Sequence, residues 1–415
     1  MLKNLVIIFF LAVVTRTFGQ SSVLGTGLWY KFSVTSDGVY RIDDALLQKA
    51  GINPAQIDPR NIKIYTGQPG MLPQANSDTR VNDLMEIAIE VFGEADGKFN
   101  TGDYVLFYAQ GPDVYNYDLK TNFFNYQNNL YTDQNFYFLT ISPSPGKRLN
   151  TSESISGNFP VINQFDDFAY YETDKYNILH SGRQWFGEQF DQSGELTIQF
   201  NLPGIIPNSS INLTSHVMAQ STSNCSFNVL FNNNSILTQP VPAWPNTQYG
   251  AQGITKVDTI LINEQSVNAS SQSAQQLKYQ FNKGSSGLSI GYLDYILFSL
   301  QRTLALYGNQ TSFISALSLS NTISTFQVNS VAANDIVWDI TQPSKIKNQA
   351  VQRGGQKRKK AEAEENPVDL EGVAERIEVR CGVAGLIDGS DPLFDDGEAK
   401  VFGGDQHFQL EFVSI

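Results

Sequence analysis

Apolar side chains recur at every second position in short segments across the second half of the chain, and this period limits the fold more than any other feature. A strand with one buried face has this period, because successive side chains point to opposite faces of a sheet. The alternating sets are Leu196, Ile198 and Phe200; Ile211, Leu213 and Val217; Phe227, Val229 and Phe231; and Leu277, Tyr279 and Phe281. Turn clusters at Asn232–Asn234 and Gly284–Gly287 separate them. Many short strands with almost no helical period predict a β-sandwich or jelly roll.

The first part of the chain has strand patterns of a similar kind. Trp29–Val34 alternates, Ser36–Gly38 has a turn composition, and Val39–Ile42 is a second short strand, which together predict a hairpin. Further strands are expected at Ile62–Tyr65 and Leu84–Phe92.

Two later strands and one helix complete the expected elements of this region. Tyr104–Ala109 and Phe136–Ile141 are apolar nearly throughout, so we expect both faces of these strands to be covered. A short helix is expected at Ala45–Ala50, since Asp43 or Asp44 can cap its start and Gly51 suits the position after its end.

A stretch rich in Ser, Pro, Gly and Asn, Ser142–Phe159, separates the two regions. This composition is typical of a linker. We therefore predict a mainly β protein, with an N-terminal β-rich domain over residues 20–160 and a β-sandwich, jelly-roll-like domain over residues 161–343.

The composition changes abruptly after Pro343. Arg353–Lys360 is basic and Glu362–Glu365 is acidic. Charge blocks of this kind are normally disordered or solvated, and the apolar residues beyond them are too few to offset the entropy of ordering a separate domain. We predict that residues 344–415 form a charged tail, largely disordered from Val351 on, and that it is a foreign or frameshifted continuation. A genuine interaction tail is the alternative.

Residues 1–19 have the three parts of a secretory signal peptide. Lys3 gives a positive start, Leu5–Val14 is an apolar run, and Thr15–Gly19 leads to Gln20, where we expect the mature chain to begin. The apolar run is too short to cross a bilayer. No later segment has the length of a transmembrane helix, so the protein is expected to be exported and not membrane-spanning.

The charge of the chain argues against one class of partner. The net charge is −13, with 41 acidic and 28 basic residues. A chain of this charge has little to release counterions from a nucleic acid, so we expect no nucleic-acid partner. Only 17% of the residues are charged, and uncharged polar residues take the solvent-facing positions, as is common outside the cytoplasm.

The cysteines and histidines provide no catalytic pair. Cys225 falls in phase with the apolar residues of the strand at 227–231, which predicts an unpaired core residue rather than a nucleophile. His216 lies within an alternating run and is expected to be a hydrogen-bonded strand residue. A cysteine nucleophile needs a histidine base, and the other histidines are His180 and His407. We assign no catalytic residue.

One loop has the composition of a cation site. Glu94–Asp103 collects oxygen ligands around two glycines, as calcium loops do, but lacks the EF-hand spacing and its terminal bidentate Glu. A polar turn between two apolar strands explains the same residues. The sequence leaves calcium open here, and we assign no metal ligand and no cofactor.

Two further sets of residues bear on binding. The Asn-x-Ser/Thr acceptors are Asn150, Asn208, Asn212, Asn224, Asn268 and Asn309. In an Asn- and Ser-rich bacterial surface protein, such motifs arise by chance. Trp185, Trp244 and Tyr249 can stack on sugar rings if exposed, so a secreted β-sandwich adhesin or glycan-binding module is an alternative function.

Four stretches carry a resemblance to a known family. They are Trp29–Ile42 (WYKFSVTSDGVYRI), Asp96–Tyr108 (DGKFNTGDYVLFY), Ser181–Phe190 (SGRQWFGEQF), and Leu293–Phe313 (LDYILFSLQRTLALYGNQTSF) followed by Val337–Thr341. They resemble the N-terminal part of the gingipain-like sortases, peptidase family C25, of the Bacteroidetes type IX secretion system. The resemblance covers residues 20–343 and stops where the composition changes.

The resemblance implies a cell-surface cysteine peptidase and transpeptidase. Such enzymes remove C-terminal sorting signals from secreted cargo, join the cargo to lipopolysaccharide, and are attached to an outer-membrane β-barrel partner. Their catalytic domain lies downstream and contains a His-Gly pair, whereas no histidine here is followed by Gly. We expect a truncated copy that acts as a non-catalytic scaffold and docking region at the bacterial cell surface. Whether this chain is itself an enzyme stays open.

Overall fold

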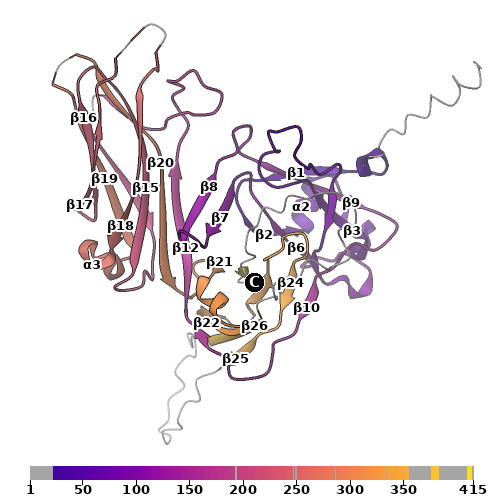
Figure 1. Ribbon diagram of the computed structural model, residues 1–415. Helices are drawn as coiled ribbons and strands as arrows, with labels where there is room; N and C mark the ends of the chain where they lie inside the picture. Colours follow the sequence, from indigo (N-terminus) through magenta and orange to yellow (C-terminus); the bar gives the residue numbers. More distant parts are fainter. Residues whose placement is uncertain are drawn as a thin grey trace, which may run out of the picture.

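A computed structural model describes residues 22–191, 194–245, 247, 250–285, 287–332, 334–354, 375–382 and 409–413. The protein is mainly β, with several antiparallel sheets, as the sequence predicts. Figure 1 shows an N-terminal unit in indigo and violet, a sandwich, and a third unit in orange. No helix within these residues is long and apolar enough to cross a membrane. The predicted signal peptide, residues 1–19, lies outside them and stays a prediction.

The N-terminal unit consists of two small sheets packed face to face. One has the strand order β1-β9-β3-β4 and the other β2-β6-β5. Ile62, Phe107 and Leu139 are buried in the core between them. The strands are β1 (Tyr30–Val34), β2 (Gly38–Asp43), β3 (Ile62–Thr66), β4 (Met85–Ile87), β5 (Glu90–Phe92), β6 (Tyr104–Ala109) and β9 (Asn135–Ile141).

The predicted hairpin of Trp29–Val34 and Val39–Ile42 is wrong. β1 pairs with β9, and β2 pairs with β6, in different sheets. The turn between them therefore crosses from one sheet to the other, and Asp37 holds it by accepting a hydrogen bond from the Gly111 amide at 2.7 Å. Both strands still bury one face, Val34 and Ile42 entering the same core.

The predicted helix is confirmed. α2 (Asp44–Lys49) begins after Asp43, whose side chain accepts a hydrogen bond from the Leu46 amide at 3.0 Å. Gly51 follows it with a φ of 80°, a left-handed conformation that glycine adopts without strain.

The predictions for the other strands of this unit are confirmed in part. Leu84–Phe92 divides into β4 and β5, which join different sheets. β6 is buried on both faces, as predicted, because Phe107 enters the N-terminal core while Leu106 packs against Trp338 of the third unit. β9 is not buried throughout: Tyr137, Leu139 and Thr140 are buried, and the other positions of the strand are half-buried.

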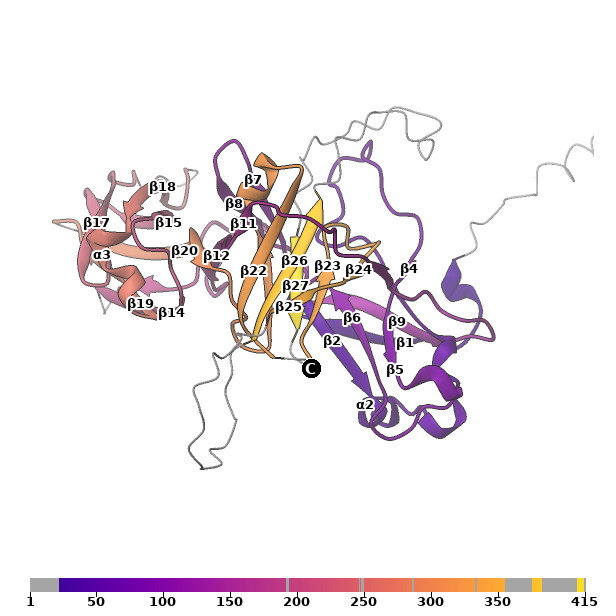
Figure 2. The ribbon, with the colours of Figure 1, turned by 90° about the horizontal axis from the view of Figure 1, so that it is seen from below.

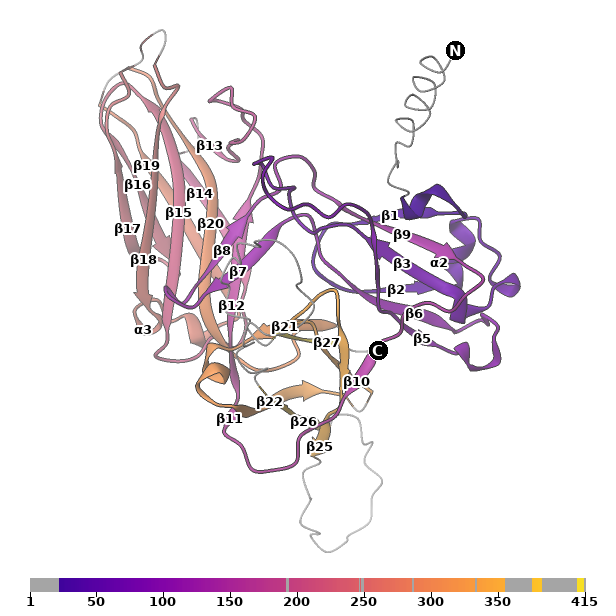
Figure 3. The same cartoon turned by 45° about the vertical axis from the view of Figure 1, so that its right-hand side comes forward.

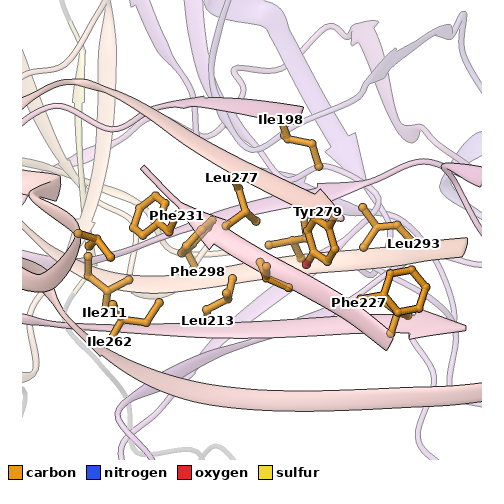
Figure 4. Packing of buried hydrophobic residues seen from close by; sticks show 14 of the residues in the cluster. Ile198, Ile211, Leu213, Phe227, Phe231, Ile262, Leu277, Tyr279, Leu293 and Phe298 are labelled. Carbon is orange, nitrogen blue, oxygen red and sulfur yellow. The ribbon is translucent and has the colours of Figure 1, made fainter. Parts of the chain in front are cut away.

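The second block forms a sandwich around the largest core. One layer has the order β14-β19-β16-β17, and the other contains β12, β20, β15 and β18. Figure 4 shows its side chains, with Phe227, Tyr279 and Phe298 between the layers. All four alternating sets identified in the sequence face this core. The strands are β12 (Gln164–Glu172), β13 (Gln189–Phe190), β14 (Glu195–Asn201), β15 (Ser210–Ser221), β16 (Cys225–Phe231), β17 (Asn234–Val241), β18 (Ile254–Asn263), β19 (Ala274–Asn282) and β20 (Ser289–Thr303), with helix α3 (Glu264–Val267).

A third unit, which the sequence did not predict, lies between the other two (Figure 2). Its core contains Phe165, Phe313 and Phe326. It is built from β11 (Val161–Ile162), β21 (Gln310–Ile314), β22 (Ile323–Val331), β23 (Ile336–Asp339) and β24 (Lys347–Gln349), and β10 (Asn150–Ser152) pairs with β24 in parallel. The division of the chain into domains at residues 160 and 161 stays a prediction.

The region predicted to be a charged tail is folded at its start. β24 lies within it and Ile346 is buried, since this residue packs with Trp338. Three further strands, β25 (Gln352–Gly354), β26 (Glu375–Gly382) and β27 (Gln409–Val413), lie in the sheets, where β26 pairs with β22 and β27 with β21. A strand that joins an existing sheet needs no core of its own. The prediction that the chain is largely disordered from Val351 on stays a prediction. The rest of the tail lies outside the described residues.

β12 and β20 form one ladder that runs through two units. Their antiparallel pairing extends without interruption from Gln164 opposite Thr303 to Glu172 opposite Tyr295. At one end Phe165 belongs to the core of the third unit, and further along Phe298 belongs to the core of the sandwich. The two units therefore share these strands.

Candidate functional site at the tyrosine and carboxylate cluster

A hairpin from the N-terminal half lies against the outer face of the sandwich. It consists of β7 (Val114–Asp118) and β8 (Phe123–Gln127), and Figure 3 shows it beside β12 and β20. Its ladder places Tyr115 opposite Tyr126 and Tyr117 opposite Phe124. Because directly opposed residues share a face of the ladder and side chains alternate, these four rings lie on one side of the hairpin.

The aromatic side of the hairpin packs on two rings of β12. Ring centroids of Tyr115 and Phe124 lie 4.3 and 4.7 Å from that of Phe168. The ring of Tyr126 packs against Tyr170. The Phe124 amide also donates a hydrogen bond to Ser299 Oγ of β20 at 2.9 Å. These contacts hold the hairpin on the sandwich.

Carboxyl groups surround the rings at the open end of the hairpin. We call Tyr126, Tyr170, Glu172, Asp174 and Asp294 the tyrosine–carboxylate cluster. The Tyr170 hydroxyl donates a hydrogen bond to Glu172. Burial, and then the nearby carboxyl groups of Asp174 and Asp294, raise the pKa of Glu172 to about 7. Burial and Asp294 also raise the pKa of Asp174.

His216 extends the cluster along the same face. Its Nδ1 lies 2.6 Å from Asp294 Oδ2, and the Gln184 amide donates to the same oxygen at 2.9 Å. Asp294 is almost completely buried, so both partners compensate for its removal from water. The prediction that His216 is a hydrogen-bonded strand residue is confirmed.

The feature of this arrangement that bears on its chemistry is a carboxyl group with a raised pKa. Glu172 exchanges its proton near neutral pH, and it does so beneath a hairpin that joins the N-terminal unit to the sandwich. When Glu172 is ionised, its charge lies among other acidic groups; when it is protonated, that repulsion is absent. The charge of the cluster therefore changes near neutral pH.

Cys225 does not take part in this site. Its side chain lies in the sandwich core, on a strand of the other layer from the one that contains His216, and its Sγ is 3.7 Å from the Val241 carbonyl. Burial raises the pKa of its thiol. The prediction of an unpaired core cysteine is confirmed. His180 is exposed and has a φ of 49°, and His407 lies outside the described residues.

The oxygens of the candidate calcium loop are used within the fold. Asp96 accepts hydrogen bonds from the Lys98 amide and the Asn100 side chain, each at 3.0 Å. Asp103 accepts one from the Asn100 amide at 2.7 Å, and Glu94 pairs with Arg148 at 2.8 Å. This is the geometry of a polar turn. Within the described part of the chain, no three acidic, histidine or cysteine side chains are grouped to hold a metal ion.

The aromatic residues considered for glycan stacking do not form one surface. Trp244 is buried, with its indole nitrogen donating to the Ala251 carbonyl at 2.5 Å, while Trp185 is 40% exposed. Tyr249 lies outside the described residues. Among the glycosylation acceptors, Asn224 accepts a hydrogen bond from the Ala243 amide at 3.0 Å. Asn208 and Asn268 have left-handed backbones, and Asn150, Asn212 and Asn309 lie in or beside strands.

Part of this site is indicated by the sequence pattern. Val114–Asp118 and Phe123–Gln127 alternate aromatic and polar residues around a short polar stretch, a pattern that predicts a hairpin with one aromatic face. The alternation of Phe168, Tyr170 and Glu172 is of the same kind. What the sequence did not indicate is that these two faces meet.

Comparison with known proteins gives a match over nearly the whole chain. No protein-family model and no curated protein matches this sequence. The crystal structure of dimeric latent PorU from Porphyromonas gingivalis superposes with a TM-score of 0.68 at 18% sequence identity, covering 95% of this chain and 32% of that one. At this low identity, the superposition shows a shared fold alone. The chain spans about a third of the length of that protein.

Two other similar structures share far less of the architecture. A carbohydrate-binding module in complex with calcium and xylotriose has a TM-score of 0.21 at 11% identity, covering 33% of this chain and 99% of that one. An insecticidal delta-endotoxin from Bacillus thuringiensis has a TM-score of 0.22 at 13% identity, covering 57% and 41%. These scores are too low to carry an argument about fold or function.

Proposed function

We propose that this chain is the non-catalytic N-terminal region of a PorU-like sortase of the type IX secretion system, and that it acts as a scaffold and docking surface. The observation that carries the proposal is the PorU-like fold, which extends over 95% of the chain. The sequence stretches that resemble the family lie within the same region. The proposal places the protein at the bacterial cell surface after export, with an outer-membrane β-barrel protein as its partner.

Two structural features support a scaffold role. The β12–β20 ladder joins the sandwich to the third unit without a linker, and the β7–β8 hairpin joins the N-terminal unit to the sandwich. Cys225 supports a non-catalytic role, because a thiol with a raised pKa in an apolar core is a poor nucleophile.

The catalytic part of the proposal is tested with the purified chain and a secreted cargo protein that ends in a C-terminal sorting signal. We expect no cleavage. Cleavage by the wild-type chain that disappears in a Cys225→Ala variant, while that variant keeps its cooperative unfolding transition, contradicts the proposal.

The docking part is tested with the purified outer-membrane β-barrel protein of the secretion machinery in detergent. We expect it to bind the immobilised chain, and an unrelated outer-membrane β-barrel of similar size serves as the control. Equal binding of both barrels, or binding of neither, contradicts a docking role. Surface proteolysis of intact Bacteroidetes cells that express the chain tests the location, since an exported surface protein is degraded while the cells remain intact.

A further inference from the structure

A cavity of about 320 Å³ lies where the turn end of the β7–β8 hairpin meets the outer face of the sandwich. This volume is within the range of small-molecule sites. Its walls include Tyr117 and Phe124 of the hairpin and Asp166, Asn212 and Ser299 of the sheet strands. It lies at the opposite end of the hairpin from the tyrosine–carboxylate cluster and is separate from it.

The cavity contains a buried carboxylate without a counter-ion. Asp166 is 6% exposed. It accepts hydrogen bonds from the Ala316 amide at 2.8 Å and from Gln301 Nε2 at 3.1 Å, and also bonds to the Tyr117 hydroxyl. No Lys or Arg in the described residues forms an ion pair with it. Removing a charge from water is costly unless an opposite charge compensates for it.

Arg302, which lies on the neighbouring strand β20, is already paired elsewhere. Arg302 Nη1 lies 2.5 Å from Asp167 Oδ2, its Nε donates to the Pro203 carbonyl at 2.7 Å, and its guanidinium lies 3.9 Å from the ring centroid of Tyr307. The positive charge of Arg302 therefore compensates Asp167, which leaves the charge of Asp166 on the cavity wall.

The other polar atoms of the wall are suited to a donor. The side-chain oxygen of Asn212 is buried and accepts no hydrogen bond from the described residues. The rings of Tyr117 and Phe124 stand edge to face, with centroids 5.0 Å apart, and their π-systems favour a positive charge nearby. An alkylammonium group provides three donors, no acceptor and a positive charge, which match this wall.

We infer that this cavity binds an alkylammonium group, from a lysine side chain of a polypeptide or from a free amine. Asp166 is the counter-ion, the Asn212 side-chain oxygen accepts one hydrogen bond, and the two hairpin rings contact the cation or its first methylene groups. Leu317, which is 45% exposed, lines the entrance and contacts the alkyl part.

The test compares ligands that differ in one group, using calorimetry on the full chain. Nα-acetyl-lysine methylamide is expected to bind at least tenfold more tightly than Nα-acetyl-norleucine methylamide, which has the same alkyl chain without the ammonium, and its binding should weaken as salt is added. n-Pentylamine distinguishes the two sources: equal binding indicates a free amine, and weaker binding a peptide lysine. Equal binding of the lysine and norleucine compounds, or tighter binding of methyl glucoside than of either amine, overturns the inference.

Substitutions in the wall and at the entrance of the cavity test whether the lysine compound binds there. Asp166→Asn should weaken binding of the lysine compound at least tenfold and leave the norleucine compound unchanged. Because Asp166 also accepts structural hydrogen bonds, Leu317→Trp provides a second test: it fills the entrance from an exposed position and should have the same effect on a folded protein. Leu288→Trp, at an exposed position that does not line the cavity, is the matched control and should bind like wild type. Unchanged binding by Leu317→Trp overturns the inference.

Discussion

Replacement of Glu172 by Gln tests whether the contact between the hairpin and the sandwich depends on pH. Gln has nearly the same shape as protonated Glu and can still accept the hydrogen bond from Tyr170. It carries no charge at any pH. The variant therefore fixes the cluster in its protonated form, and only the ionisation of this one group is removed.

The expected effect follows from the raised pKa. The folded protein holds the proton of Glu172 up to about pH 7, compared with an ordinary value of 4.5. Each unit of difference corresponds to about 1.36 kcal/mol, and partial screening by solvent at the edge of the cluster reduces the total to roughly 2 to 3 kcal/mol. Because the folded state binds the proton more tightly, this stability is present below the ordinary pKa and is lost as pH rises through the folded pKa.

Urea unfolding followed by tryptophan fluorescence at pH 5, 6, 7 and 8 measures the effect. Wild type and Glu172→Gln should have similar unfolding free energies near pH 5, and the variant should be more stable by roughly 2 kcal/mol at pH 8. Other carboxyl groups change with pH in both proteins and cancel in the difference. Glu153→Gln, at an exposed site, is the control. A difference between wild type and variant that stays constant from pH 5 to pH 8 refutes the reasoning.

Three further substitutions test the packing. Phe168→Ala removes the ring on which the hairpin packs and should cost about 2 kcal/mol, with faster protease cleavage at residues 119–122; unchanged cleavage would mean that the hairpin is held by other contacts. Cys225→Ala should lower the free energy of unfolding in urea by about 1 kcal/mol without changing the circular dichroism spectrum. A much larger loss of stability would argue against a simple packing role. Gly204→Ala should lower the thermal unfolding midpoint, because Gly204 has a φ of 77° and its added Cβ would collide with the Tyr307 hydroxyl; a neutral result would contradict the backbone geometry.

The parts of the fold that depend on neighbouring residues could be predicted from the sequence. Asp43 caps α2 through a bond to a residue three positions away. The β16–β17 turn is formed by Asn232 and Asn233, which both adopt left-handed backbones that Asn tolerates better than most residues. Along β14, β16 and β19 only one face of each strand meets the sandwich core, so the period of two was sufficient to identify their buried side chains.

The choice of strand partner could not be predicted in the same way. β1 and β2 have the pattern of a hairpin, but their partners β9 and β6 lie far along the chain, and nothing in the turn at Ser36–Gly38 encodes that. The third unit was missed for a related reason: its short strands come from both sides of the sandwich sequence.

The candidate site, too, could be predicted from the sequence only in part. Its aromatic alternations are visible in the sequence. The raised pKa of Glu172 depends on burial, which follows from the way β12 packs with segments that are not its neighbours in the sequence, such as the β7–β8 hairpin. The charge of Asp166 is another example, because only the fold shows that Arg302 pairs with its neighbour Asp167 instead. A sequence pattern predicts which side chains share one face of a strand, but it does not predict which other strand packs against that face.

The shared β12–β20 ladder has a mechanical consequence. When a protein is pulled, two units joined by a flexible linker separate at low load. Here the hydrogen bonds of the ladder run from Gln164 to Glu172 across the junction. A force along these strands loads the bonds in shear, so many must break together before the units part. Under tension, the sandwich and the third unit should therefore extend as one element, in a single rupture event.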